Sequence, residues 1–477
     1  MNPGRGIGSG RTPRRSLLAD APVSAGVAVV GASALLAGGL MLARGGGREE
    51  GMRFWTFAVE HRDLYEGIVR EWNASGGEPV VLRQVTSAAL ERRLLASFFA
   101  DVPGPDLVEV ERGMAPLAFA GPLEAIGFLD LTERIQAEGL FDEIDPAAFS
   151  PWTSRGRIFG LPHDVHPVML AYRADLVEGA GIDVSEIETW DDFRRVLAPL
   201  MADADGDGEP DRYLLAFWEN VEDKVEVFLL QADGRLFDEE ERPALDAPAN
   251  ARALAEMATW VAGPGRFATD VPDFSASGNR LKVDGRALFY VMPDWMCDVW
   301  QNDLPQLAGK MKLMPLPAFV PGGRRTSVWG GTMLAITDGA PDPEAAWAFA
   351  KHLYLSDELA VRLYEEAEII TPIRRHWSHP VFDEPDPFFS GQAKGRLYIG
   401  LIPQVPPRNS SPFYRIARRL ACEALRSLAA WHRAHPGAGR SELEARAADL
   451  LRDAQEELVR RMEANVFHRG ALREEEA

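Results

Sequence analysis

Residues 52–110 alternate between segments typical of strands and segments typical of helices. Apolar, β-branched and aromatic runs predict strands at 52–59, 80–85 and 106–110, and amphipathic spacing predicts helices at 61–73 and 88–100. This β-α-β-α-β order is expected to form a parallel sheet covered by helices, so the chain is predicted to be an α/β protein. In such a fold the binding loops lie outside the carboxyl ends of the strands.

The rest of the chain keeps the α/β mixture. Strands are predicted at 168–172, 286–292 and 332–337, and the last helices at 414–434 and 441–465. Thr189 and Asp192 predict a capping box at a helix start, and Asp342-Pro343 predicts another start with Pro in the first turn. Ser441 and Glu444 predict a second capping box.

The N-terminal segment differs in composition from the rest of the chain and is left out of the fold prediction. Residues 1–20 are basic, 21–43 carry no charge, and 44–51 form a glycine-rich linker. As a helix, 21–43 spans about 34 Å, which is enough for a bilayer core. The pair Arg14-Arg15 resembles a twin-arginine export signal, and an ordinary basic leader fits it as well. We expect residues 52–477 to be exported, either released by cleavage or tethered to the outer face of the inner membrane by 21–43.

The charge and the cysteines exclude several classes of protein. The chain has 51 Lys and Arg against 72 Asp and Glu, a net charge of −21, which argues against a nucleic-acid partner. Cys297 and Cys422 are the only cysteines, and with no C-x-x-C pair a cysteine-based zinc or redox site is excluded. We expect two buried free thiols, with one disulfide as the alternative.

The order of several short motifs resembles the extracellular solute-binding proteins of ABC importers, of the maltodextrin and multiple-sugar binding type. The segments that carry the resemblance are 54–57 (FWTF), 105–108 (PDLV), 159–162 (FGLP), 170–173 (LAYR), 188–193 (ETWDDF), 284–289 (DGRALF) with Trp295, 329–332 (WGGT), the 343–353 helix and 370–374 (ITPIR). The 188–193 segment departs from the family's usual Pro before its Thr-Trp, and 370–374 lacks the family's Gly. The resemblance covers about residues 52–465.

The resemblance implies a two-lobed periplasmic-binding-protein fold (class II) that closes around a ligand in the interlobe cleft. The first lobe is expected to take 52–164 and 324–376, and the second 165–323 and 377–465, with 466–477 as a tail. The implied function is to capture a sugar or oligosaccharide and deliver it to the transmembrane subunits of an ABC permease. The implied protein is a monomer that requires no cofactor and catalyses no reaction.

Sugars present apolar C–H faces and hydroxyl rims, which proteins hold with aromatic rings, carboxylates, arginines and amides. The positions that match the family's contact segments are Trp295, Trp329, Gly330, Glu111, Arg112, His166, Glu60, His61 and Trp55. Trp295 is the leading candidate, because it follows a predicted strand end and occupies the place of the family's stacking Trp. Core packing is the alternative for the two tryptophans Trp295 and Trp329, and a solvated loop is the alternative for the polar residues.

The sharpest local motif is acidic. Asp203, Asp205, Asp207 and Asp211 stand at positions 1, 3, 5 and 9 of a calcium-loop pattern, with Gly206 at 6. Position 12 is Leu214, so the usual bidentate Glu is missing. A structural calcium ion and an acidic, solvated turn therefore both fit. The pair His163 and His166 lacks the H-E-x-x-H spacing, and no metal site is expected there.

Two other functions stay open. The same fold with an acidic cleft suits a polyamine or another cationic solute. An exported carbohydrate-active enzyme is the third reading, since an acidic chain offers many carboxylate pairs. No nucleophile elbow (G-x-S-x-G), Walker loop or dinucleotide-binding glycine motif supports catalysis.

Overall fold

The computed structural model describes residues 51–100, 102–201, 203 and 206–465. The expectations for 1–50 and for the tail at 466–477 therefore lie outside the described residues. Among the described residues no helix combines the length and the apolar character that a membrane crossing needs.

The first lobe is built on a five-stranded sheet with the order β2-β1-β3-β12-β6. Its strands are β1 Met52–Thr56, β2 Val80–Gln84, β3 Leu107–Glu111, β6 Leu161–Pro162 and β12 Thr332–Ile336. The strands β2, β1 and β3 are parallel, as the β-α-β-α-β alternation predicts, whereas β12 is antiparallel to both β3 and β6. Its helices are α2 Val59–Ala74, α3 Ser87–Phe99, α4 Ala115–Ala118, α5 Thr132–Ala137, α6 Leu140–Glu143, α7 Pro146–Phe149, α14 Pro343–Tyr354 and α15 Asp357–Ala367.

Both faces of this sheet are covered, which explains the apolar composition of its strands. Leu107 and Leu334 point into one hydrophobic cluster with helices α2 and α14, and Val108 and Met333 point into a second cluster with α3. Successive residues of a strand face opposite sides of the sheet, so β3 and β12 contribute to both clusters in alternation. A short hairpin of β4 Thr153–Ser154 and β5 Arg157–Ile158 completes this lobe.

The second lobe is built on another five-stranded sheet, with the order β11-β7-β10-β8-β9. Its strands are β7 Val168–Arg173, β8 Tyr213–Ala216, β9 Ala268–Thr269, β10 Ala287–Pro293 and β11 Met311–Pro315. Its helices are α8 Ala174–Val177, α9 Trp190–Leu197, α10 Glu222–Gln231, α11 Pro248–Val261, α12 Ala276–Asp284, α13 Met296–Asp303 and α16 Lys394–Leu401, with the terminal α17 Tyr414–Ala434 and α18 Arg440–Ala464. Every residue of β7 and β10 is buried.

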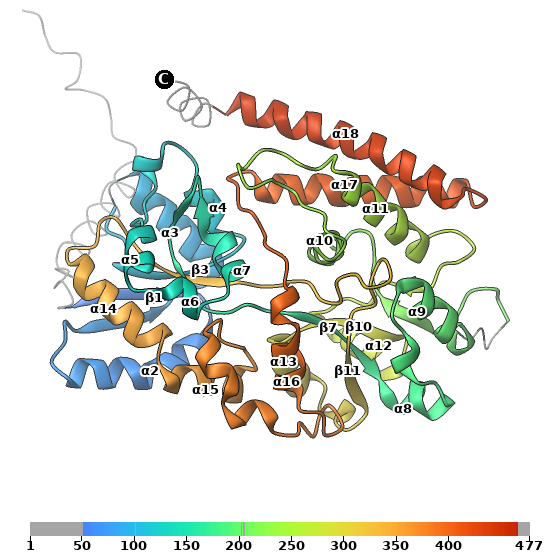
Figure 1. Cartoon of the computed structure of the whole chain (residues 1–477), viewed down its shortest axis with the longest axis horizontal. Helices are drawn as coiled ribbons and strands as arrows, with labels where there is room; N and C mark the ends of the chain where they lie inside the picture. Colours follow the sequence, from blue (N-terminus) through green and yellow to red (C-terminus); the bar gives the residue numbers. More distant parts are fainter. Residues whose placement is uncertain (1–50, 101, 202, 204–205, 466–477) are drawn as a thin grey trace, which may run out of the picture. The chain divides into compact units, whose positions relative to one another are not determined.

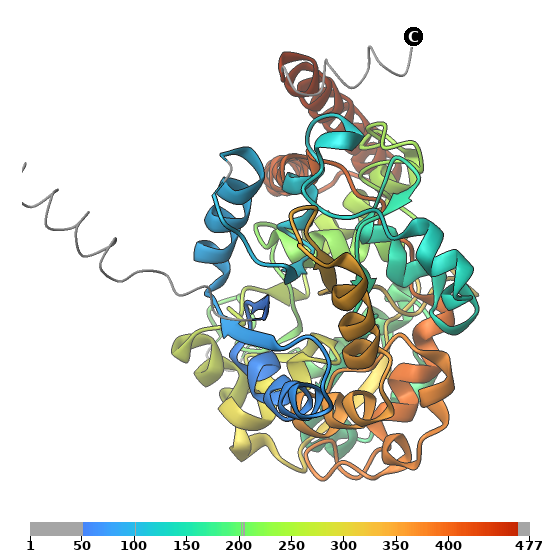
Figure 2. The same cartoon turned by 90° about the vertical axis from the view of Figure 1, so that its left-hand side faces the viewer.

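The terminal helices pack on the second lobe. Helix α18 contacts α11 and α17, and it lies outermost of the three in both views (Figure 1 and Figure 2). Its buried residues Leu443, Ala447, Leu451 and Leu458 recur at helical spacing, so α18 presents one apolar stripe to its neighbours. The expected α/β fold with two lobes and C-terminal helices is confirmed.

Two of the three predicted helix starts are confirmed, and one is wrong. The capping box of Thr189 and Asp192 is present at the start of α9, and Asp342 caps α14. The capping box of Ser441 and Glu444 is wrong, because α18 begins at Arg440 with Gly439 as its N-cap. This earlier start places Arg440 where its guanidinium pairs with Glu256 of α11.

Cys297 and Cys422 are both buried and free, as expected.

Two segments join the lobes, and they run side by side. The chain passes from β6 to β7 through 163–167 and returns from β11 to β12 through 316–331. Pro167 and Val328 form an antiparallel bridge, and the amide of Val168 donates to the carbonyl of Ser327 at 3.2 Å. The paired crossing segments form the floor from which the binding cleft opens.

Candidate binding cleft

A cavity of about 360 Å³ lies between the two sheets, beside the crossing segments. It is lined by Phe57, Glu60, His61, Glu111, Arg112, Asp164, His166, Trp295, Asp298, Val299, Gly330, Gly331, Thr332, Ala367 and Ile369. Glu111 ends β3 and Arg112 follows it, while Glu60 and His61 follow β1 at the start of α2. The cavity thus opens at the carboxyl ends of parallel strands, where the α/β architecture places its ligands.

The structure brings seven of the nine sequence-predicted ligand residues to this cavity. They are Trp295, Gly330, Glu111, Arg112, His166, Glu60 and His61. Trp55 does not line it, because its side chain packs on the second hydrophobic cluster of the first lobe. Trp329 does not line it either, and only 5% of this residue is exposed.

Trp295 is held by its neighbours with its ring at the cavity. It stands at the N-terminus of α13, and its indole N–H donates to the carbonyl of Trp329 at 2.7 Å. The two indole rings meet edge to face, with centroids 5.9 Å apart. Trp329 therefore supports Trp295 from behind, which corrects its expected role as a residue of the cleft wall.

The glycine pair behind these rings serves close packing within the protein. Gly330 and Gly331 have φ of +124° and +126°, a region that side chains rarely adopt. A Cβ on Gly330 would lie 2.4 Å from the His166 ring and 3.0 Å from the Trp295 indole nitrogen. Gly330 lets the crossing segment pass between the rings of His166 and Trp295, and Gly331 packs against Arg408 and Trp152.

Arg112 contacts the opposite lobe. Its guanidinium donates to Glu226 at 2.8 Å and also pairs with Asp223, both on α10. Burial opposes ionisation of Glu226, but Arg112 and two further arginines lower its pKa to about 2. Because its charge is neutralised by these carboxylates, Arg112 is less available to a ligand than its position in the sequence indicates.

Beneath the cavity, the Glu109 network fills the polar interior of the first lobe. It consists of Glu109 on β3, Thr56 on β1, His61 and Tyr65 on α2, Tyr354 on α14, and His163. The Glu109 carboxylate, which is fully buried, accepts hydrogen bonds from Tyr65 at 2.5 Å, from Tyr354 at 2.6 Å and from Thr56, and it lies 3.0 Å from Nδ1 of His61.

The charge of Glu109 is stabilised by these donors. Burial alone would raise the pKa of this carboxyl, but His61 and the other partners lower it to about 2. The pKa of His61 is raised in turn, because Glu109 outweighs the effect of burial. His61, Glu109 and His163 stand close enough for a metal ion, but the carboxylate already accepts hydrogen bonds from Thr56, Tyr65 and Tyr354. The network is therefore a hydrogen-bonded support for the wall that carries His61.

The His166 bridge joins the crossing segment 163–167 to the second lobe. Nε2 of His166 lies 3.1 Å from Asp164 in the crossing segment, and Nδ1 lies 2.7 Å from Asp294 at the end of β10. Burial would lower the pKa of His166, but these two carboxylates raise it to about 10. Both ring nitrogens are occupied by carboxylates, so His166 orients the cleft floor and has no N–H left for a ligand.

Sequence reasoning missed most of these supports. Tyr65, Tyr354 and Asp294 received no role, because their partners are distant along the chain. Asp164 and Asp298 received no role either. One signal was available for Glu109, which stands in the run Leu107-Val108-Glu109-Val110. A charged residue inside an otherwise apolar strand requires buried partners if both sheet faces are covered.

The acidic loop, residues 203–211, lies apart from the residues of the cleft wall. Both carboxylate oxygens of Asp203 accept backbone N–H groups, from Gly206 at 2.8 Å and from Gly208 at 3.0 Å. The amide of Glu209 donates to Asp207 at 2.8 Å. Asp205 lies outside the described residues. The described part of the loop is a turn closed by its own backbone.

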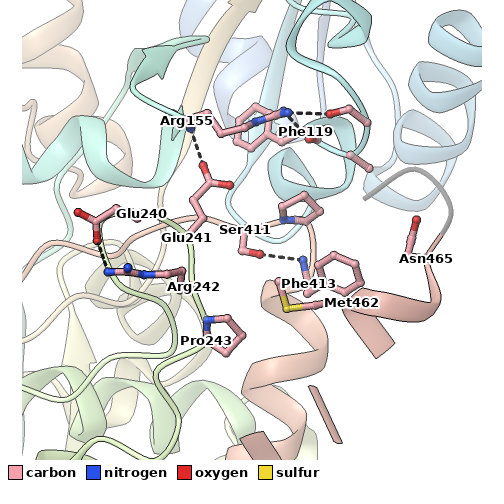
Figure 3. A pocket seen from close by; sticks show the side chains of 13 residues that line it. Phe119, Arg155, Glu240, Glu241, Arg242, Pro243, Ser411, Phe413, Met462 and Asn465 are labelled. Carbon is pink, nitrogen blue, oxygen red and sulfur yellow. Dashed lines mark hydrogen bonds and ion pairs between the residues drawn. The ribbon is translucent and has the colours of Figure 1, made fainter. Parts of the chain in front are cut away.

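A second hollow, of about 220 Å³, forms where both lobes meet the terminal helices. Figure 3 shows Glu241 pointing toward Arg155, whose amide donates to its carboxylate at 2.6 Å. The Arg155 guanidinium also holds the carbonyls of Phe119 and Gly121, at 3.0 Å and 2.8 Å. This hollow contains none of the sequence-predicted residues, and its contacts join the β4–β5 hairpin of the first lobe to the loop before α11 of the second.

Comparisons with known proteins agree with this architecture. The family profile for the bacterial extracellular solute-binding proteins matches residues 58–359. An arabinooligosaccharide-binding protein of Halalkalibacterium halodurans is 26% identical over 349 residues, which cover 70% of this chain and 74% of that protein. A protein of the same name from Bacillus subtilis is 24% identical over 318 residues, covering 64% and 69%. The sugar-binding protein MalE of Xanthomonas citri has a similar fold, with a TM-score of 0.66, 19% identity and coverage of 86% of this chain and 98% of that one.

Proposed function

This chain belongs to the bacterial extracellular solute-binding proteins, and from that membership we propose that it captures an oligosaccharide in the cleft and delivers it to an ABC permease. Membership in this family makes it an exported binding protein and not an enzyme. The two relatives above are named for arabinooligosaccharides, which makes an arabinose oligomer the first ligand to test.

The observation that carries the proposal is the pairing of an aromatic face with polar groups in one cavity. Trp295 offers a ring from the second lobe, and Glu60 and Glu111 offer carboxylates from the first. An indole ring packs against the C–H face of a sugar while carboxylates accept hydrogen bonds from its hydroxyls. Lobe closure brings the two surfaces together around the ligand and excludes water from it.

Tryptophan fluorescence and calorimetric titration with a panel of sugars test this function. Trp295→Ala should weaken sugar binding at least tenfold, since a buried aromatic contact is worth about 1.4 kcal/mol or more. Trp431→Ala on α17 is a matched control outside the cavity and should bind as the unmodified protein does. Absence of binding to every sugar, or equal affinity of the two variants, would exclude the proposal.

A cationic solute is the second candidate, and one observation favours it. Glu60, Glu111 and Asp298 share the cavity, and the pKa of Asp298 is raised by burial and by the charge of Glu60. A polyamine ammonium group would relieve this repulsion. Spermidine in the same panel separates the candidates. A fluorescence change on addition of spermidine, but on addition of none of the sugars, would favour the cation.

The lobe boundaries belong to the same proposal. We assign 52–164 with 324–376 to the lobe that carries β1, and 165–323 with 377–465 to the lobe that carries β10.

The N-terminal segment is assigned to export. Residues 21–43 would act as a signal peptide or as a membrane anchor. Sequencing the N-terminus of the protein recovered from membrane and periplasmic fractions distinguishes cleavage from tethering.

A structural calcium ion at Asp203, Asp205, Asp207 and Asp211 completes the proposal. The Asp203 carboxylate accepts hydrogen bonds from the amides of Gly206 and Gly208, which makes the loop compact. This compact shape supports the proposed calcium site. Titration of calcium into chelator-treated protein should release heat, and Asp205→Ala should abolish that heat. If the unmodified protein gives no heat, the loop is a turn that needs no ion.

A further inference from the structure

Phe274 is an exposed aromatic residue next to the binding cleft. It lies in the loop between β9 and α12, and 66% of it is exposed, the largest fraction among the large hydrophobic side chains of the described residues. Its ring is nearly parallel to that of Trp295, with an angle of 13° between the planes and 6.2 Å between the centroids. Trp295 lines the cavity and Phe274 does not, so the aromatic surface continues from the cavity onto the second lobe.

The loop that carries Phe274 is anchored on both sides. Lys224 of α10 pairs with the carboxylate of Asp273 at 3.0 Å, and Lys282 of α12 donates to the carbonyl of Asp273 at 2.6 Å. Both lysine side chains are almost fully buried. Burial lowers the pKa of Lys282 to about 8, so holding its ammonium in this place costs free energy.

The residue after Phe274 is fixed as well. The hydroxyl of Ser275 accepts the amide of Gly278 at 3.0 Å and so caps α12. A Cβ on Gly278 would meet the carbonyl oxygen of Pro272 at 1.8 Å, which shows how closely the helix packs on this loop. The phenyl ring is thus displayed from a rigid loop, and a ligand that stacks on it would not have to order that loop first.

The two rings stack with nearly parallel planes, so Phe274 extends the aromatic surface of Trp295 beyond the cavity. A linear oligosaccharide exposes successive C–H faces along its length, and the exposed ring of Phe274 is available to a sugar unit beyond the one at Trp295. A sugar unit that stacks on this phenyl ring removes apolar surface from water, which favours the complex. Resting on the proposed sugar-binding function, we propose that Phe274 forms an outer sugar subsite next to Trp295, so that the protein selects oligosaccharides over shorter sugars.

Chain-length dependence of binding tests this assignment. Arabino- and malto-oligosaccharides from disaccharide to tetrasaccharide are titrated by calorimetry into the unmodified protein, Phe274→Ala and Phe274→Tyr. We expect the affinity of the unmodified protein to rise with chain length. Phe274→Ala should lose about five- to tenfold for the tetrasaccharide and less than twofold for the disaccharide, whereas Phe274→Tyr should keep the affinity.

Phe99→Ala is the matched control, because Phe99 is similarly exposed but lies at the end of α3 in the first lobe. It should leave the whole series unchanged, and melting temperatures confirm that all variants fold. An equal loss across the series, or no loss, in Phe274→Ala overturns the outer subsite while sugar binding by the unmodified protein upholds the proposed function. If the unmodified protein binds no member of either series, both the subsite and the sugar function are rejected.

Discussion

The Glu109 network and the acidic loop both gather carboxylates, but they satisfy them in different ways. Glu109 is fully buried and takes its donors from Thr56, His61, Tyr65 and Tyr354, which come from three separate elements. The loop residue Asp203 is exposed and takes its donors from amides three and five residues ahead. A contiguous motif is visible in a sequence, whereas a site assembled from distant residues is visible only in the fold, and here the assembled one supports the cleft.

The largest expected effect lies in the buried network. Glu109→Ala should destabilise the protein by about 3–5 kcal/mol, since it leaves a buried histidine and three hydroxyl donors without their acceptor. Urea unfolding at neutral pH measures the loss. Glu71→Ala on the exposed face of α2 should change stability by less than about 0.5 kcal/mol. Equal losses in the two variants would contradict the difference drawn between buried and exposed carboxylates.

The His166 bridge predicts a loss of stability at alkaline pH. The ordinary pKa of histidine is 6.5, and Asp164 and Asp294 raise that of His166 to about 10 despite burial. The stabilising interaction is therefore complete below pH 6.5 and is lost as the pH rises toward 10. His166→Asn, which suits the positive φ of 45° at this position, should be less stable at pH 6.5 and should lack this decline.

Unfolding curves between pH 6 and pH 10 measure the alkaline decline, with the exposed His352→Asn as control. We expect His352→Asn to follow the unmodified protein at every pH. If His166→Asn retained the full decline, other groups would cause it, and the His166 bridge would not be its source.

A smaller effect is expected at acidic pH. The pKa of Glu109 falls from an ordinary value of 4.5 to about 2 in the folded protein. The stabilisation by its charge is present above pH 4.5 and is lost as the pH falls from there toward 2. Glu109→Gln should be less stable at neutral pH and show a shallower decline between these values. A decline as steep as that of the unmodified protein would exclude Glu109 as its source.

The smallest effect is expected in the acidic loop. In the absence of calcium, Asp203→Asn should change the free energy of unfolding by less than about 1 kcal/mol, because an exposed turn keeps its amide partners in water. Thermal melting of chelator-treated protein measures this. If Asp203→Asn destabilised the protein as much as Glu109→Ala, the difference in exposure between the two carboxylates would not explain their contributions to stability.

The sequence allowed the positions of the cleft residues to be predicted better than their roles. Glu111 and His61 were expected at the ends of parallel strands, because alternation of strands and helices determines which ends meet. Trp329 was expected at the cavity and instead supports Trp295, since the side on which a ring is presented depends on contacts made across the fold. Capping of α9 at Thr189 was predictable because its hydrogen bonds span three residues. The position of Ser441 within α18 was not, because a pairing with α11 decides where that helix begins.

The placement of β12 has a consequence for biosynthesis. This strand lies between β3 and β6 in the first sheet, although it is translated after every strand of the second sheet. Until residues 332–336 have been made, the emerging chain has two open strand edges in its first lobe, and such edges invite pairing with other chains. Domains of a nascent chain usually fold in order of synthesis, from the N-terminus onward. Here the lobe that begins first can only be completed near the end of synthesis, after every strand of the second sheet has been made.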